Sequence, residues 1–163
     1  MRKALITLTA FVGLAACQST PEQSRSALQM VPVSEAIALL DATCGATRPD
    51  FSGVEARFQA RGLTRDMGVA WQSETKALVG RVTEMADGTP ICWVGGTYEG
   101  DLIALQNELA SRYGGARHSD VAYFGAVRVP EYNRGAKGKM LINLGNSRAG
   151  AATAEYLLGI VGG

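Results

Sequence analysis

Residues 78–98 read LVGRVTEMADGTPICWVGGTY, with a turn signal between two runs of apolar residues. Apolar residues recur at every second or fourth position on both sides of Asp87-Gly88, a spacing typical of strands with one buried face. An Asp-Gly pair between two such runs is a strong short-range signal for a β-hairpin. The stretch therefore predicts two adjacent antiparallel strands, the second of which contains Cys92.

The flanking segments alternate between strand and helix periodicity. Met67, Val69 and Trp71 alternate and predict a strand before the hairpin. After the hairpin, leucines at helical spacing predict a helix over 101–112 that ends at Gly114-Gly115. Strand spacing returns over 121–129 and 140–144, whereas residues 154–161 fit either a last strand or a helix.

Two helices are expected before the first strand. Val33, Ile37, Leu40 and Cys44 recur at helical spacing, which predicts a helix with Cys44 on its buried face. The segment 52–62 begins with a Ser-Gly-Val-Glu capping box and predicts a second helix. We expect these two helices to form a helical hairpin.

The order of the predicted elements indicates an α+β fold. Short connections within each group of strands favour an antiparallel sheet of five or six strands with helices packed on one face. Residues 32–163 show no second domain boundary and no internal repeat, so we expect a single globular domain.

The first residues carry a targeting signal rather than a fold signal. Met1-Arg2-Lys3 is positively charged, and the apolar run over 4–13 is about half the length needed to span a bilayer. With Leu14-Ala15-Ala16-Cys17 behind it, residues 1–18 resemble the lipobox of bacterial lipoprotein precursors.

This resemblance implies both processing and location. Residues 1–16 would be removed as a signal peptide, and covalent acyl chains on Cys17, the only cofactor expected, would hold the chain on the membrane. Gln18 stands where an inner-membrane retention signal would place Asp, which favours the outer membrane, facing the periplasm. Residues 17–31 are polar and predict a flexible tether.

Two cysteines remain besides Cys17, and we expect them to pair with each other. An exported chain meets an oxidising compartment, where Cys44 and Cys92 are best interpreted as a disulfide. A metal site would need more ligands than these thiols and His118, so none is expected. A catalytic thiol would need a histidine closer in sequence than His118.

Charge argues against a nucleic-acid partner. Without Arg2 and Lys3, 14 basic residues face 15 acidic ones, so the mature chain lacks the positive surface that nucleic acid requires.

The sequence offers one weak catalytic candidate and one weak binding loop. His118-Ser119-Asp120 groups hydrolase-type residues, but adjacent side chains point in different directions, and a polar turn is the favoured interpretation. The loop containing Arg134, Lys137 and Lys139 fails as a phosphate-binding Walker motif because Met140 follows the last Gly-Lys. It predicts either a solvated connection or a contact with anionic lipid head groups or wall phosphates.

Two further groups of residues complete the candidates. Trp71, Trp93 and Tyr98 predict core positions on strands rather than an exposed platform. Six acidic residues could supply a glycosidase-type pair if two of them met in space: Asp50, Glu55, Glu74, Glu84, Asp87 and Glu99.

The sequence favours a non-catalytic role. We expect a membrane-anchored envelope lipoprotein that binds another envelope protein or cell-wall material. The alternative is a small envelope hydrolase that uses His118 or a carboxylate pair.

Overall fold

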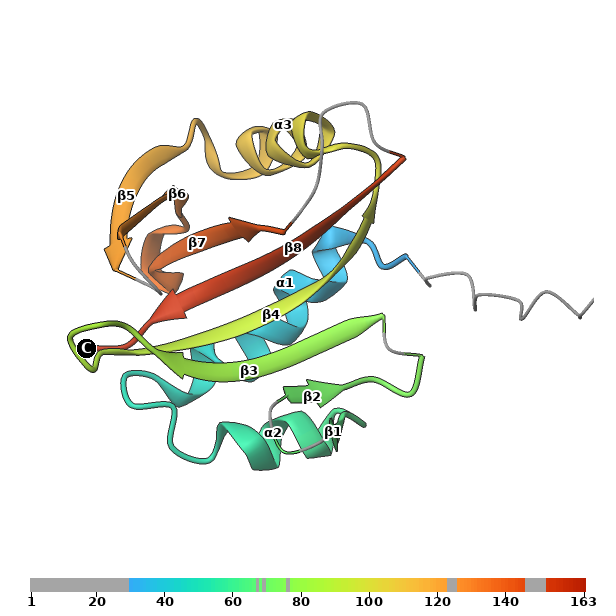
Figure 1. Cartoon of the computed structure of the whole chain (residues 1–163), viewed down its shortest axis with the longest axis vertical. Helices are drawn as coiled ribbons and strands as arrows, with labels where there is room; N and C mark the ends of the chain where they lie inside the picture. The colour runs from blue at the N-terminus through green and yellow to red at the C-terminus, as the bar shows by residue number, and fades with distance from the viewer. Residues whose placement is uncertain (1–29, 67, 69, 76, 123–125, 146–151) are drawn as a thin grey trace, which may run out of the picture.

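A computed structural model describes residues 30–163 apart from 67, 69, 76, 123–125 and 146–151. Its strands form one eight-stranded antiparallel sheet in the order β1-β2-β3-β4-β8-β7-β6-β5 (Figure 1). The strands are β1 (Thr64–Asp66), β2 (Ala70–Gln72), β3 (Leu78–Glu84), β4 (Pro90–Glu99), β5 (Arg117–Ala122), β6 (Ala126–Asn133), β7 (Lys139–Leu144) and β8 (Thr153–Val161). The helices are α1 (Val33–Ala42), α2 (Val54–Ala60) and α3 (Leu102–Tyr113), with 3-10 turns η1 (Gly45–Thr47) and η2 (Gly135–Lys137).

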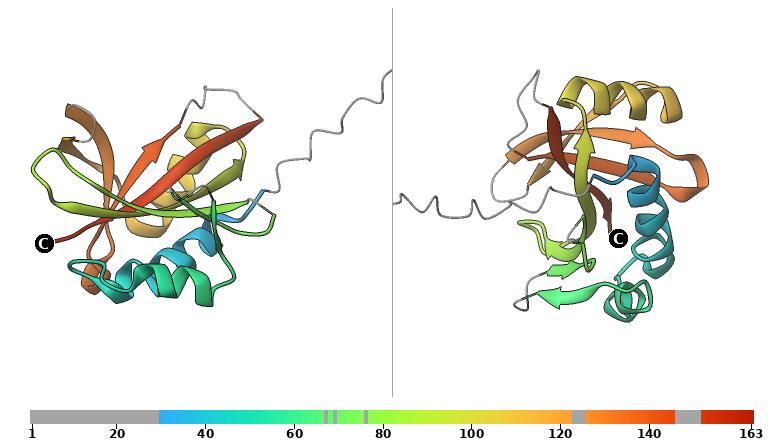
Figure 2. Two further views of the ribbon diagram at one scale, coloured as in Figure 1. Left: turned by 60° about the horizontal axis from the view of Figure 1, so that its bottom comes forward. Right: turned by 90° about the vertical axis from the view of Figure 1, so that its right-hand side faces the viewer.

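The helices contribute to one core on one face of the sheet, as predicted. This helix face carries Cys92 and Val94 of β4, which belong to the same buried cluster as Leu40 of α1, Phe58 of α2 and Leu105 of α3. Figure 1 shows α1 crossing behind β4 and β8, and Figure 2 shows the same arrangement from two further sides. The α+β class and the antiparallel sheet are therefore confirmed.

The prediction of five or six strands is wrong, because the described residues form eight. The segment 121–129 was expected as one strand, but it falls on two paired strands, β5 and β6. The strand β1 was not expected at all. Its three residues are all exposed, so no alternation of apolar and polar residues marks it in the sequence.

The predicted helical hairpin is also wrong. The helix α1 packs on β4 and β8, whereas α2 packs on β2, so each helix packs mainly on its own part of the sheet. The capping box fails as well, because Gly53, in a left-handed conformation with φ 75°, occupies the N-cap of α2. The N–H of Ser52 instead donates to Oδ1 of Asp50 at 3.0 Å, which closes a turn ahead of the helix.

The predicted disulfide is present and joins the first helix to the middle of the sheet. Cys44 lies just beyond the end of α1 and bonds to Cys92 of β4, with 5.6 Å between the Cα atoms. The buried Thr43 hydroxyl donates to the Leu39 carbonyl at 2.7 Å, which satisfies the end of the helix next to the bond.

The last segment is a strand, which settles the alternative that the sequence left open. Strand β8 lies between β4 and β7 and is paired along its length. Its position in the sheet depends on partners more than 50 residues away in β4, which a local pattern cannot show. Within the described part of the chain, no helix is long and apolar enough to cross a membrane.

Candidate functional site

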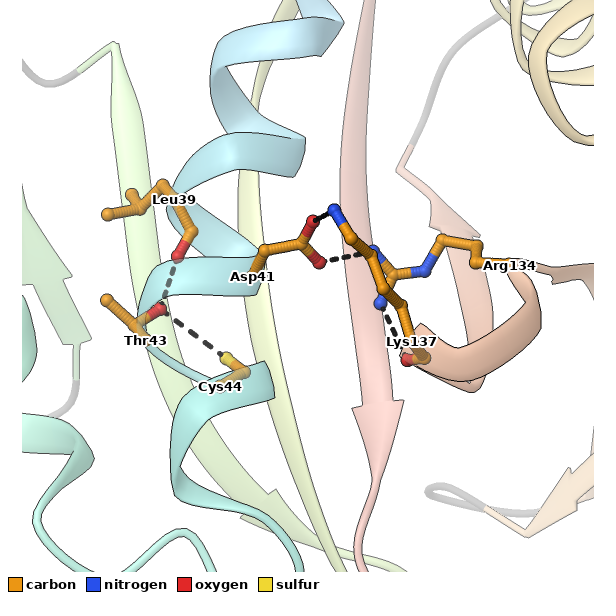
Figure 3. A network of polar contacts seen from close by, with 6 residues as sticks. All are labelled: Leu39, Asp41, Thr43, Cys44, Arg134 and Lys137. Carbon is orange, nitrogen blue, oxygen red and sulfur yellow. Dashed lines mark hydrogen bonds and ion pairs between the residues drawn. The ribbon is translucent and has the colours of Figure 1, made fainter.

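The predicted basic loop is bound to the end of α1. The guanidinium of Arg134 and the ammonium of Lys137 both bind the carboxylate of Asp41, the latter at 2.7 Å (Figure 3). Nη2 of Arg134 also donates to the Lys137 carbonyl at 3.3 Å. The Arg134 side chain is only 1% exposed, so its charge is shielded from solvent and held by Asp41.

Asp41 is the residue that the sequence analysis missed here. Burial by itself raises the pKa of this carboxyl, but hydrogen bonds from Lys137 and Arg134 outweigh it and hold the pKa below its ordinary value. Lys139 is also paired, at 3.1 Å from Glu131. Each of the three cations of the predicted loop is therefore paired with a carboxylate of the chain, and only that of Arg134 is buried.

The other predicted polar site residues are exposed where the structure describes them. His118 is exposed on the edge strand β5, opposite Pro130, and the predicted turn at this point is a strand. Nothing is described of the side chains of Ser119 and Asp120, and Cys17 lies outside the described residues. All six predicted carboxylates are exposed: Asp50, Glu55, Glu74, Glu84, Asp87 and Glu99.

The aromatic side chains pack in or against the core, as predicted: Trp93 is buried, and Trp71 and Tyr98 are partly buried. Trp71 packs on Phe58 with ring centroids 6.3 Å apart, and Tyr98 also packs against the core of the helix face. Trp93 is buried on the other side of the sheet, which we call the open face, together with Ile91, Val129 and Leu141. Its indole N–H donates to Oγ1 of Thr83 at 2.8 Å.

The open face also holds a groove of about 410 Å³ that the sequence did not reveal. It runs over β3, β4, β8 and β7, and its lining includes Val79, Arg81, Thr97, Asn143, Glu155 and Leu157. This volume lies in the range of small-ligand sites.

Strand register explains the shape of the groove. Paired residues form three rows across the open face: Arg81, Trp93, Gly159 and Leu141; then Val79, Gly95, Leu157 and Asn143; then Thr97 and Glu155. The first row is filled, because the Trp93 ring covers Gly159. The second row has no side chain at Gly95, and Leu157 lies over that position. The groove therefore lies over the second and third rows, with Arg81 at one end.

No protein family, curated protein or solved structure matches this chain.

Two side chains that line the groove each have a buried polar atom without a hydrogen-bond partner, the hydroxyl of Tyr156 and Nε of Arg81. Of the two, Arg81 is the charged residue. It is half-buried, and its Nε is buried without a hydrogen-bond partner. It lies where β2 leaves β3, because the ladder between these strands stops at Trp71 and Gly80. No acidic side chain among the described residues pairs with it, so the guanidinium can bind an anion from outside the chain.

The residues that line the groove determine which chemical groups it presents to a ligand. Among the described residues that line it, none is a histidine or a cysteine. The described residues also contain no group of three or more His, Cys, Asp or Glu side chains arranged for a metal ion. The groove presents an apolar surface bordered by the guanidinium of Arg81, the amide of Asn143 and the carboxylate of Glu155.

Proposed function

We propose that this chain is a lipid-anchored, non-catalytic binding protein of the bacterial envelope, and that the groove on the open face is its ligand site. The groove carries the proposal, because it combines apolar walls with a half-buried arginine that lacks a partner. Ligand sites are typically concave and mostly apolar, with a few polar groups that fix the orientation of the ligand.

The proposed anchor rests on the lipobox at Leu14–Cys17 and on the polar tether behind it. Acyl chains on Cys17 would hold the protein on the membrane, with the outer membrane favoured by Gln18. The tether enters the domain next to the groove, since the N–H of Val31 donates to the carbonyl of Thr97 at 3.2 Å. The partner we propose is a component of the cell wall or another envelope protein.

Metabolic labelling tests the anchor. Cells that express the full chain are grown with an alkyne-bearing fatty acid, and we expect the label on the wild-type protein and in the membrane fraction. Cys17→Ser should abolish both the labelling and the membrane association. The double variant Cys44→Ser/Cys92→Ser is the control and should keep the label. Labelling that survives Cys17→Ser would contradict the proposal.

An NMR titration tests the groove. The mature chain, residues 17–163 with Cys17→Ser, is mixed with short peptides and with wall-derived sugar fragments. We expect amide shifts to change around Val79, Gly95 and Asn143. Val79→Trp fills the second row and should abolish these changes. The matched control Val82→Trp lies on the same strand but on the other face, where Val82 is 39% exposed, and should leave binding intact. Shift changes confined to other surfaces would overturn the proposal.

A further inference from the structure

The chemistry of Arg81 narrows the class of ligand. An arginine presents its N–H donors in a planar fork, which matches a carboxylate in a bidentate arrangement. Here Nε is buried and unpaired, and no described residue supplies a carboxylate to the guanidinium. Because Nε is buried, a ligand carboxylate would bind the remaining N–H groups of the half-buried guanidinium, where a charge-assisted hydrogen bond is strong.

The rest of the groove sets the length and polarity of the ligand. Four residues of strand separate the row of Arg81 and Trp93 from the row of Thr97 and Glu155, a distance of roughly 13 Å at 3.3 Å per residue. An extended peptide of three or four residues has this length. In the middle row, Val79 and Leu157 form apolar walls, and the Asn143 amide can both donate to and accept from a peptide group.

The charges that line the groove favour a peptide over a polyanion as its ligand. Arg81 is the only Lys or Arg among the described residues that line the groove, and the carboxylate of Glu155 lies at the opposite end. A single carboxylate is balanced by one guanidinium, whereas a multiply charged phosphate would need further cations. A peptide with one C-terminal carboxylate and an otherwise neutral backbone matches the charges at both ends of the groove.

We infer that the groove binds a short extended peptide by its free C-terminal carboxylate, which Arg81 holds, with the preceding side chain between Val79 and Leu157. This inference rests on the proposed function, because it names the ligand class of the same groove.

The test compares two peptides on the wild-type protein. Acetyl-trialanine with a free carboxylate and the same peptide with a terminal amide are titrated into the mature chain and followed by NMR. We expect the acid to bind roughly tenfold or more tightly than the amide, because a charge-assisted bond to Arg81 is lost in the amide. Equal affinity of the two peptides would overturn the inference, and this comparison does not depend on any variant being folded.

Two variants then assign the effect to Arg81. Arg81→Gln should remove the difference in affinity between the acid and the amide peptide. The control is Arg61→Gln, at an exposed position at the end of α2, and it should preserve this difference. Inorganic phosphate is titrated separately against the bound acid peptide. Displacement of the peptide by millimolar phosphate would show a general anion site and would overturn the inference. If both peptides bind the groove equally, the carboxylate inference fails while the proposed function stands. If neither peptide binds and the sugar fragments bind outside the groove, both the carboxylate inference and the proposed function fail.

Discussion

The carboxylate of Asp41, in the last turn of α1, binds the guanidinium of Arg134, which lies 93 positions further along the chain. Lys137 binds the same carboxylate from the solvent side, so one acidic residue holds two cations of the β6–β7 connection. This contact ties the N-terminal helix to the far half of the sheet (Figure 3). The loop that the sequence predicted as a possible anion-binding site is therefore bound to α1 through Asp41.

Replacing Asp41 should destabilise the protein. Asp41→Asn leaves the buried Arg134 without its counter-charge, and we expect a loss of about 2 kcal/mol in the free energy of unfolding. Lys137→Gln is the matched control on the other side of the carboxylate. The Lys137 side chain is 66% exposed, so its loss should cost less than about 1 kcal/mol. Urea unfolding of both variants measures the difference, and equal costs would contradict the assigned roles.

The same contact predicts a pH dependence with a defined sign. The pKa of Asp41 is lowered in the folded protein, so its contribution to stability is present above its unfolded pKa of 3.8 and is lost as the pH falls through the folded value. The gap in unfolding free energy between wild type and Asp41→Asn should therefore be constant near neutral pH and shrink below pH 3.8. Asp66→Asn, at an exposed position on β1, is the control for removing an acidic side chain outside this contact.

Breaking the disulfide should be more costly than any single surface change. Cys44 and Cys92 are 48 positions apart, and closing a loop of this size restricts the unfolded chain by about 4 kcal/mol in the chain-entropy model. Cys44→Ser/Cys92→Ser should therefore lower the unfolding free energy by up to about this amount. Unfolding of the wild type with and without a reductant gives an independent measurement. A reductant that leaves the wild-type midpoint unchanged would contradict the prediction.

The filled end of the open face should not tolerate an added methyl group. A Cβ at Gly159 would lie 2.5 Å from ring atoms of the buried Trp93, so Gly159→Ala should cost about 1 to 3 kcal/mol through overpacking. Gly115→Ala is the control, because a Cβ there meets nothing within 4 Å. Trp fluorescence during urea unfolding follows both variants. A stable Gly159→Ala protein would show that the Trp93 ring moves easily.

Helix capping gives a test in which the sequence pattern and the structure disagree. Oδ1 of Asp101 accepts the N–H of Ala104 at 2.9 Å and caps α3, so Asp101→Ala should cost about 1 kcal/mol. Ser52→Ala should have almost no effect, because Gly53 rather than Ser52 occupies the N-cap of α2. Thermal unfolding compares the two. A larger loss for Ser52→Ala would restore the capping box that the sequence predicts.

Features whose signals are local were predictable from the sequence. The Asp87-Gly88 turn, the helix that follows Asp101 and the buried position of Cys44 each depend on residues within about a dozen positions, and the structure contains all three. The disulfide was predictable because only two cysteines remain once Cys17 is assigned to the anchor. The anchor itself stays a prediction of the sequence.

Features that depend on pairing between distant segments were not predictable. The place of β8 between β4 and β7, the split of 121–129 into two strands and the pairing of Asp41 with Arg134 each join residues that no local pattern links. The groove is the strongest case. Its rows exist only because the register of the four strands places Arg81, Val79 and Leu157 on the same face, since a shift of one residue would turn every side chain to the other face. The sequence alone determined the chemistry of these residues and the class of fold, and tertiary packing decided which of them meet.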